Sequence, residues 1–227
     1  MKQFKCRASQ IEKLLTNDRS GKAMGYTAKS YIKEWVISEI TGKEKDIKSK
    51  YLSRGNAMEA FAINRVGKYY GCELQKNEIQ LENEYFTGIY DAVTIDRVID
   101  TKVPFDCFTF PFFVVKIDPD YYGQLQVYME LTGLKKASLC YCLENGSEEQ
   151  IERLSWQIAK ELGKDEPDMS EWDLAEKQLS YDHLPDDFRI KVFEFEYDEL
   201  FIANAKQRVL DARKYIETEL LKESQNL

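Results

Sequence analysis

The chain has 227 residues, with 40 acidic and 32 basic side chains and a formal net charge of −8. This length fits one domain with a substantial buried core, and we expect a single domain over 1–227, divided into an N-terminal helical part (1–50), a core (51–145) and a C-terminal extension (146–227). The longest uncharged stretches, such as 107–115, are far too short to cross a bilayer, and no apolar leader opens the chain. We therefore expect a cytoplasmic protein with no membrane partner.

The charge and the rarer residue types narrow the chemistry. A net negative charge argues against a polyanionic partner, because nucleic-acid binding relies on cations that neutralise phosphates. Residues 1–54 are nevertheless rich in lysine and arginine, and a basic N-terminal face would still attract such a partner. The five cysteines form no C-x-x-C pair, which argues against a zinc site and a disulfide framework. His183 is the only histidine, and we expect it on the surface.

The N-terminal part is predicted to be helical. Arg7–Thr16 has the pattern of a short helix capped by Ser9, with Glu12 three residues later completing a capping box. Alternatively, Arg7 and Ser9 bind a phosphate at the helix start, where backbone N–H groups point outward. A second helix is predicted over 28–42. Its apolar residues recur at three- and four-residue spacings, which indicates a core-facing surface: Tyr31, Ile32, Trp35, Val36 and Ile40.

A third helix is predicted over Ser53–Lys68, after a charged run, 43–50, that is typical of a solvated connection. Glu59 lies at the edge of the apolar side of this helix, so its carboxylate points toward apolar surroundings, where an unpaired charge is costly. From its helix alone, Glu59 is more simply interpreted as an ordinary glutamate on a solvated surface. The strands that follow favour a functional role.

From Cys72 the hydrophobic period shifts toward two, which predicts three strands of an antiparallel meander: Cys72–Leu81, Tyr85–Ile95 and Arg97–Val103. The turn between the last two falls near Asp96, so Asp91 and Asp100 come close across the hairpin. Asp100 and Lys102 share one face because side chains alternate along a strand. Such a group can hold a divalent cation beside a reacting phosphate, although an ordinary charged hairpin is the alternative. Gly88 would allow backbone or a ligand to approach closely.

A helix is next predicted over 118–132, ending at Gly133 as its C′ residue. Gln124 and Tyr128 are four residues apart and lie one above the other on one face. A strand is predicted over 135–143. A helix between strands in this order indicates an α/β crossover.

The remaining segments are less informative. The aromatic segment 106–113 is interpreted as core packing beneath a loop, or as an apolar wedge against DNA ends or a partner subunit. The C-terminal third is predicted to contain a helix over 151–162, an irregular acidic segment over 165–185, an edge strand over 188–197 and one long helix from 198.

In chain order, the candidate residues form a series: Glu59 on a helix, Asp91 on a strand, Asp100-Thr101-Lys102 on the next strand, and Gln124 and Tyr128 on the following helix. This series resembles the PD-(D/E)XK nuclease superfamily, and more closely its phage lambda exonuclease or YqaJ-like viral recombinase branch. Further similarities are Arg7-Ala8-Ser9 before a short helix, Gly55-Asn56 ahead of the glutamate, and Pro104-Phe105 after the lysine. The resemblance covers roughly residues 5–145, and Asp100 stands where glutamate is commoner in the branch.

The resemblance implies an α/β (α+β) fold: a restriction-endonuclease-like core with a central mixed β-sheet flanked by helices, N-terminal helices and a long C-terminal helix. It also implies a Mg²⁺-dependent deoxyribonuclease, with Mn²⁺ able to substitute. The implied reaction is hydrolysis of linear double-stranded DNA from 5′ to 3′ in phage-type homologous recombination. The implied partners are double-stranded DNA ends, a single-strand annealing recombination protein and further copies of the chain, as a trimer by analogy.

The same resemblance implies roles for the site residues. Asp91 and Asp100 would ligate Mg²⁺ directly. The Thr101 carbonyl would add a ligand, and Glu59 would bind the metal or its water. Lys102 would orient and help to deprotonate the attacking water, or stabilise the charge that builds on the phosphate.

Substrate contacts are implied for a second group of residues. Gln124 and Tyr128 would position the substrate strand or the lysine, and Gln124 and Arg54 are candidates for substrate binding. Arg7 and Ser9 are candidates for the anchor of a 5′-phosphate.

Three alternatives stay open. One is a structure-specific endonuclease of the same superfamily, including the iron–sulfur type of CRISPR adaptation, against which the absence of any cysteine after Cys142 counts. Another is a non-catalytic DNA-binding or assembly subunit, which the presence of all the acids and the lysine disfavours. A small-molecule enzyme with a carboxylate metal site is weakly supported, because no nucleotide-binding loop is visible.

Overall fold

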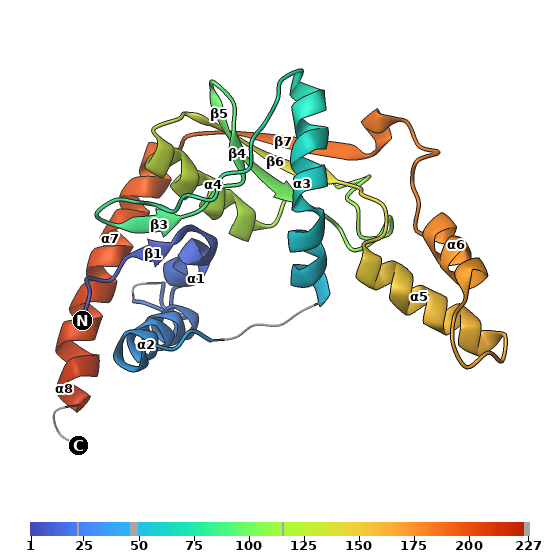
Figure 1. Ribbon diagram of the computed structural model, residues 1–227. Coiled ribbons are helices and arrows are strands. Elements are labelled where there is room, and N and C mark those ends of the chain that lie inside the picture. The colour runs from blue at the N-terminus through green and yellow to red at the C-terminus, as the bar shows by residue number, and fades with distance from the viewer. Residues whose placement is uncertain (22, 46–49, 115, 225–227) are drawn as a thin grey trace.

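The computed structural model describes residues 1–227 apart from 22, 46–49, 115 and 225–227. It has a mixed α/β architecture in which two mixed sheets are flanked by helices, as predicted for the fold class. Figure 1 shows helix α7 (Glu199–Tyr215) along one side of the molecule, with helices α5 (Glu148–Glu161) and α6 (Met169–Gln178) on the opposite side.

The larger sheet has the strand order β4-β5-β6-β7. Its strands are β4 (Ala92–Val93), β5 (Arg97–Lys102), β6 (Lys136–Cys142) and β7 (Ile190–Glu196). Strands β5 and β6 are parallel and the other neighbours are antiparallel, so helix α4 (Pro119–Thr132) is the crossover between β5 and β6. The predicted crossover and the predicted edge strand, β7, are both confirmed.

Helices cover both faces of this sheet at β5. Val98 packs into a buried cluster with Leu125 of α4, whereas the next residue, Ile99, packs with Ala62 of α3 (Lys50–Tyr70). This alternation is the one expected along a strand. Strand β5 therefore ends between α3 and α4, the two helices that carry the other candidate residues.

The second sheet is small and has the order β1-β3-β2. Its strands are β1 (Cys6–Arg7), β2 (Leu81–Glu82) and β3 (Phe86–Gly88), with β1 parallel and β2 antiparallel to β3. The predicted meander is wrong in two respects. Most of Cys72–Leu81 is not a strand, and Tyr85–Ile95 is divided between the two sheets as β3 and β4.

The division occurs because the backbone between β3 and β4 bonds to a loop. The Asn77 N–H donates to the Asp91 carbonyl at 2.7 Å, and the Asn77 side-chain amide donates to the Tyr90 carbonyl at 3.1 Å. These bonds replace the strand pairing that the alternating pattern predicted. As a result, Asp91 lies outside both sheets.

The N-terminal helix differs from its prediction at the start. After β1 the chain enters a 3₁₀ turn (Ala8–Gln10) and then α1 (Ile11–Leu15), and the Ser9 side chain caps neither element. The predicted capping box is therefore wrong. Its physical reason is that Cys6–Arg7 pair with β3, so regular helix begins after Ser9.

Helix α2 (Tyr26–Thr41) ends at Gly42, whose φ of 64° lies in the left-handed region that favours glycine. Ile32 of the predicted stripe is fully buried, but Ile40 is 66% exposed. Ile40 lies in the last turns of the helix, beyond the residues that pack on the core. Residues 46–49 of the predicted connection 43–50 lie outside the described residues.

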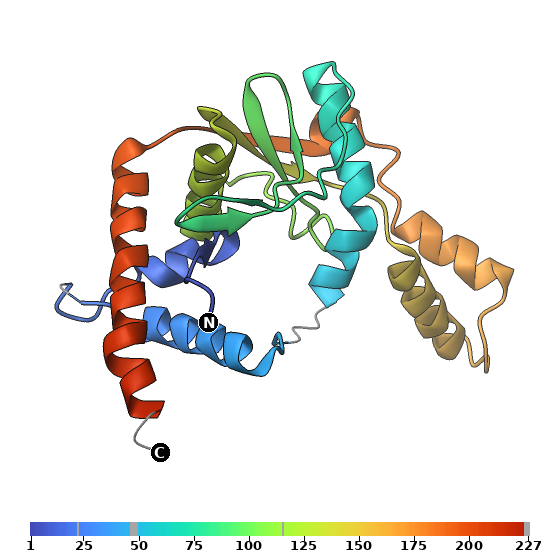
Figure 2. The same ribbon diagram turned by 60° about the vertical axis from the view of Figure 1, so that its left-hand side comes forward.

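The prediction of an irregular segment over 165–185 is wrong, because α6 forms within it. The Asp168 side chain caps α6, and Glu171 completes a capping box. Helix α6 packs against α5, and together they form a helical hairpin that projects from the sheet (Figure 2). The predicted long C-terminal helix is confirmed, since α7 continues through a π-helical turn (Ile216–Leu220) into α8 (Leu221–Ser224).

In the aromatic segment 106–113, core packing holds for one ring and fails for two others. Phe110 is buried beside Leu143, which is core packing. Phe108 and Phe113 are 93% and 97% exposed, so core packing is wrong for these two rings. For these two rings, contact with DNA ends or with a partner subunit stays a prediction.

Within the described part of the chain, no helix has the length and apolar character needed to cross a membrane. Cys140 and Cys142 are buried in β6. His183 is exposed, as predicted.

Candidate active site

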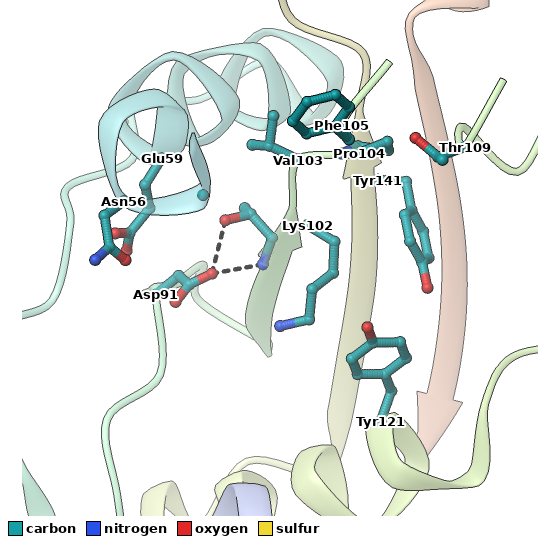
Figure 3. Close-up of a pocket in the computed structure, with 12 residues that line it drawn as sticks. Asn56, Glu59, Asp91, Lys102, Val103, Pro104, Phe105, Thr109, Tyr121 and Tyr141 are labelled. Atoms are coloured by element: carbon teal, nitrogen blue, oxygen red, sulfur yellow. Dashed lines mark hydrogen bonds between the residues drawn. The ribbon is translucent and has the colours of Figure 1, made fainter. Parts of the chain in front are cut away.

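A pocket of about 440 Å³ opens at the end of β5 (Figure 3). It brings together residues from α3, α4, both central strands and the loops beside them: Gly55, Asn56, Glu59, Asp91, Thr101, Lys102, Val103, Pro104, Phe105, Thr109, Tyr121 and Tyr141. Three of the predicted catalytic residues, Glu59, Asp91 and Lys102, line this one pocket.

Asp91 is held against β5 although it belongs to no strand. Its Oδ2 accepts hydrogen bonds from the backbone N–H of Thr101 at 2.6 Å and from the Thr101 hydroxyl at 2.7 Å (Figure 3). A carboxylate with two such donors has a fixed position. The expected proximity of Asp91 to the Asp100–Lys102 strand therefore arises from this side-chain contact and not from strand pairing.

Asp100 is the most enclosed acid of the group, at 2% exposure. Its Oδ2 lies 2.5 Å from Lys102 Nζ but receives no hydrogen bond of regular geometry, and its Oδ1 accepts from the Gln124 amide at 3.3 Å. Burial raises the pKa of Asp100 to about 6; Lys102 opposes this rise and the Asp91 carboxylate adds to it. The site therefore holds a buried carboxylate that is paired with a lysine and accepts a hydrogen bond from a glutamine.

Lys102 projects into the pocket, with Nζ 5.1 Å from the centre of the Tyr121 ring. Burial alone would lower the pKa of Lys102, but the carboxylates of Asp100 and Asp91 outweigh burial and raise the pKa above its usual value. The side chain is therefore an ammonium at neutral pH.

Gln124 and Tyr128 connect α4 to this group. The Gln124 amide donates to the Tyr128 hydroxyl at 2.8 Å as well as to Asp100, and the Tyr128 hydroxyl donates to the Ile89 carbonyl at 2.6 Å. Burial raises the pKa of Tyr128, so the hydroxyl keeps its proton. Tyr128 is 4% exposed and does not line the pocket. Tyr128 therefore contacts the segment before Asp91 and the Gln124 amide from outside the pocket.

Gly88 permits this contact, and its replacement tests it. A Cβ at Gly88 would lie 2.8 Å from Tyr128 Cε1 and 3.0 Å from the Ala8 side chain. We expect Gly88→Ala to lower the free energy of unfolding by about 1–3 kcal/mol, the usual cost of overpacking, as measured by urea denaturation. Gly55→Ala is the control, because a Cβ there meets nothing within 4 Å. Equal stability of the two variants would show that the Tyr128 ring moves aside freely.

Glu59 faces the pocket from α3, on the side where Asp91 lies (Figure 3). Its carboxylate accepts from Lys76 Nζ at 2.8 Å, and its side chain is 20% exposed. The alternative of a fully solvated glutamate does not fit this environment. Lys76 was not found from the sequence, and nothing in its local pattern indicated this partner. Asn56, one turn before Glu59, also lines the pocket.

Arg54 does not occupy the position expected of a substrate ligand. It is 2% exposed, and its guanidinium donates to the carbonyls of Pro104, Glu144 and Asn145 at 2.8–3.1 Å and to the Gln150 side chain. With its donors occupied by the protein, it ties α3 to the segments that follow β5 and β6. This corrects its assignment to substrate binding.

Arg7 and Ser9 do not line the pocket. Both are exposed, and Arg7 pairs with Glu44 at 2.9 Å. Their proposed binding of a 5′-phosphate stays a prediction.

The donor chemistry of the pocket fits a hard divalent cation. Asp91, Asp100, Glu59 and the Thr101 carbonyl offer only oxygen, the ligand that Mg²⁺ prefers. The buried Oδ2 of Asp100 forms an ion pair with Lys102 that lacks regular hydrogen-bond geometry. Across the described residues, no three His, Cys, Asp or Glu side chains are already gathered closely enough to hold a metal ion. The carboxylates are instead engaged by Thr101 and by lysines.

No protein-family model matches the chain, and no curated protein matches it by sequence. Among solved structures, a phage-related exonuclease from Haemophilus somnus 129PT is similar over 98% of this chain and 97% of its own, with a TM-score of 0.76 and 27% identity. Structures of an alkaline exonuclease from Laribacter hongkongensis, one of them in complex with dAMP, are similar over 98% of this chain and 92% of their own, with a TM-score of 0.68 and 18% identity. The chain has an exonuclease fold. This exonuclease fold supports a nuclease activity and agrees with the resemblance seen in the sequence.

Proposed function

We propose that the protein is a metal-dependent exonuclease that degrades linear double-stranded DNA from 5′ to 3′ in phage-type homologous recombination. The observation that carries the proposal is the pocket in which Glu59, Asp91 and Lys102 meet, beside the buried Asp100 and within an exonuclease fold. Phosphodiester hydrolysis needs oxygen ligands for a metal ion and a positively charged side chain held beside them.

Asp91, Asp100, Glu59 and the Thr101 carbonyl would hold Mg²⁺. When bound, the ion would supply Lewis-acid polarisation of the phosphate and a lowered pKa for a bound water. Mn²⁺ accepts the same oxygen ligands, so we propose that it substitutes.

Lys102 contributes charge. Before a metal ion binds, the carboxylates of Asp100 and Asp91 raise the pKa of Lys102, so its side chain is an ammonium there. Both roles implied by the resemblance belong to the proposal: Lys102 would orient and help to deprotonate the attacking water, or stabilise the charge that builds on the phosphate. Gln124 positions Asp100 by donating to its Oδ1, and Tyr128 positions the segment that ends in Asp91.

The wider setting belongs to the same proposal. The substrate would be double-stranded DNA ends in a bacterial host cytoplasm. The partners would be a single-strand annealing recombination protein and further copies of the chain, as a trimer.

The proposal is tested by digestion of linear duplex DNA, with and without a 5′-phosphate, beside closed circular DNA. In Mg²⁺ or Mn²⁺ we expect progressive loss of the linear DNA alone. In EDTA we expect no loss, because the ion is removed, and excess Mg²⁺ should restore the rate. Gel electrophoresis over time measures the remaining DNA, and end-labelled substrates report the direction.

Two results would change the assignment. Cutting of closed circles would make the protein an endonuclease. Binding of DNA without hydrolysis in either metal would make it a non-catalytic subunit.

A further inference from the structure

One face of α5 combines exposed cations with an exposed aromatic ring. A surface groove of about 630 Å³ runs along this face. Its lining residues lie on α5 and in the loop that follows it, and they are mostly basic or aromatic: Arg153, Trp156, Gln157, Lys160, Lys164 and Asp165. Trp156 is 46% exposed. This composition contrasts with the net charge of −8 of the whole chain.

Two of the cations have no carboxylate partner within the described part of the chain. Among the described residues, Arg153 and Lys160 form no ion pair, whereas Lys164 at the far end is paired with Asp168 and Glu171. Exposed cations without partners raise the local potential and can bind phosphate. Arg153 and Lys160 therefore place one cation on each side of Trp156, on a helix that also carries four glutamates.

The groove adjoins the candidate active site. The Arg153 guanidinium lies 5.6 Å from the centre of the Phe105 ring, and Phe105 lines the catalytic pocket. The Gln150 side chain of α5 donates to the Phe105 carbonyl at 3.0 Å. The start of α5 is thereby fixed to the rim of the pocket. From that rim, α5 leads away from the sheet as part of the hairpin (Figures 1 and 2).

We propose that the α5 groove binds an unpaired segment of DNA next to the active site, with bases stacked on Trp156 and phosphates at Arg153 and Lys160. An exposed ring between cations suits single-stranded nucleic acid, because stacking needs bases that are free of their complement. Duplex DNA would present only its backbone to this face. The inference rests on the proposed nuclease function and adds the form of DNA that leaves or enters the pocket.

The test measures binding of a fluorescein-labelled oligothymidylate by anisotropy, in EDTA to prevent hydrolysis. Trp156→Ala is expected to weaken binding about tenfold, the loss typical of one stacked base. Arg153→Gln and Lys160→Gln are each expected to reduce the slope of log Kd against log salt by about 0.7. The controls are Trp172→Ala and Lys177→Gln on α6, which are exposed in the same hairpin but outside the groove.

A tenfold weaker affinity of the single variant Trp156→Ala for the oligothymidylate, with wild-type affinity in both controls, supports binding in the groove. Unchanged binding in Trp156→Ala overturns it. An equal loss on a blunt duplex of the same length overturns the assignment to unpaired DNA. Failure of the nuclease proposal appears separately, as inability of the wild-type protein to degrade linear DNA in Mg²⁺. Circular dichroism and thermal melting confirm that each variant is folded.

Discussion

Asp100→Asn is expected to lower the rate of DNA degradation by on the order of 10²–10³-fold or more, the scale on which loss of one fixed catalytic dipole acts. The substitution removes a proposed metal ligand and the ion-pair partner of Lys102 together. Asparagine has almost the same shape and keeps an oxygen that can accept from Gln124. The fold should therefore persist. The measurement is the initial rate of loss of linear duplex DNA in Mg²⁺, with circular dichroism as the check on folding.

Asp96→Asn is the matched control. Asp96 lies in the turn that precedes β5 and pairs with Arg97 and Lys136 on the surface, away from the pocket. It undergoes the same chemical change close to Asp100 in sequence, and we expect the wild-type rate. A wild-type rate for Asp100→Asn would exclude Asp100 from the catalytic site.

Short sequence patterns predicted the structure correctly where a segment's own residues determine its conformation. The helix predicted over 118–132, with Gly133 after its last turn, matches α4 closely, and the structure makes Asp118 its N-cap and Gly133 its C-cap. The i, i+2 spacing of Asp100 and Lys102 places them on one face of a strand, where they form an ion pair. Strand alternation and helix capping act over a few residues, so the sequence contains them.

Local signals failed where distant segments decide. Ser9 and Glu12 match a capping box, but the pairing of β1 with β3 shifts the helix start past Ser9. Asp91 was predicted within a strand, yet bonds to Asn77 and Thr101 hold it in a loop. These partners are set by the packing of the whole chain.

One error had a signal that was available. The acidic segment 165–185 was predicted to be irregular on composition, although Asp168 and Glu171 have the spacing of a capping box. Acidic residues at the start of a helix are stabilising, so a high acid content there favours α6.

The burial of Arg54 leads to the largest expected effect on stability. Arg54→Met would keep the apolar stem but remove the guanidinium, leaving the carbonyls of Pro104, Glu144 and Asn145 without a donor. Each unsatisfied buried carbonyl costs about 1–3 kcal/mol. We expect the free energy of unfolding to fall by on the order of 3–5 kcal/mol in urea titrations, the range for loss of one partner from a buried charged network.

Arg19→Met is the control, because Arg19 is exposed and such surface changes usually stay within about 0.5 kcal/mol. The two interpretations of Arg54 predict opposite results. A substrate ligand would leave the urea midpoint unchanged and weaken DNA binding. A structural residue would lower the midpoint, and DNA binding per folded molecule would be retained under conditions where the variant is still folded. The hydrogen bonds from α3 to Pro104 and to the segment after β6 support the second result, because they join the helix that carries Glu59 to the strand end that carries Lys102. Stability and the geometry of the pocket therefore depend on the same side chain.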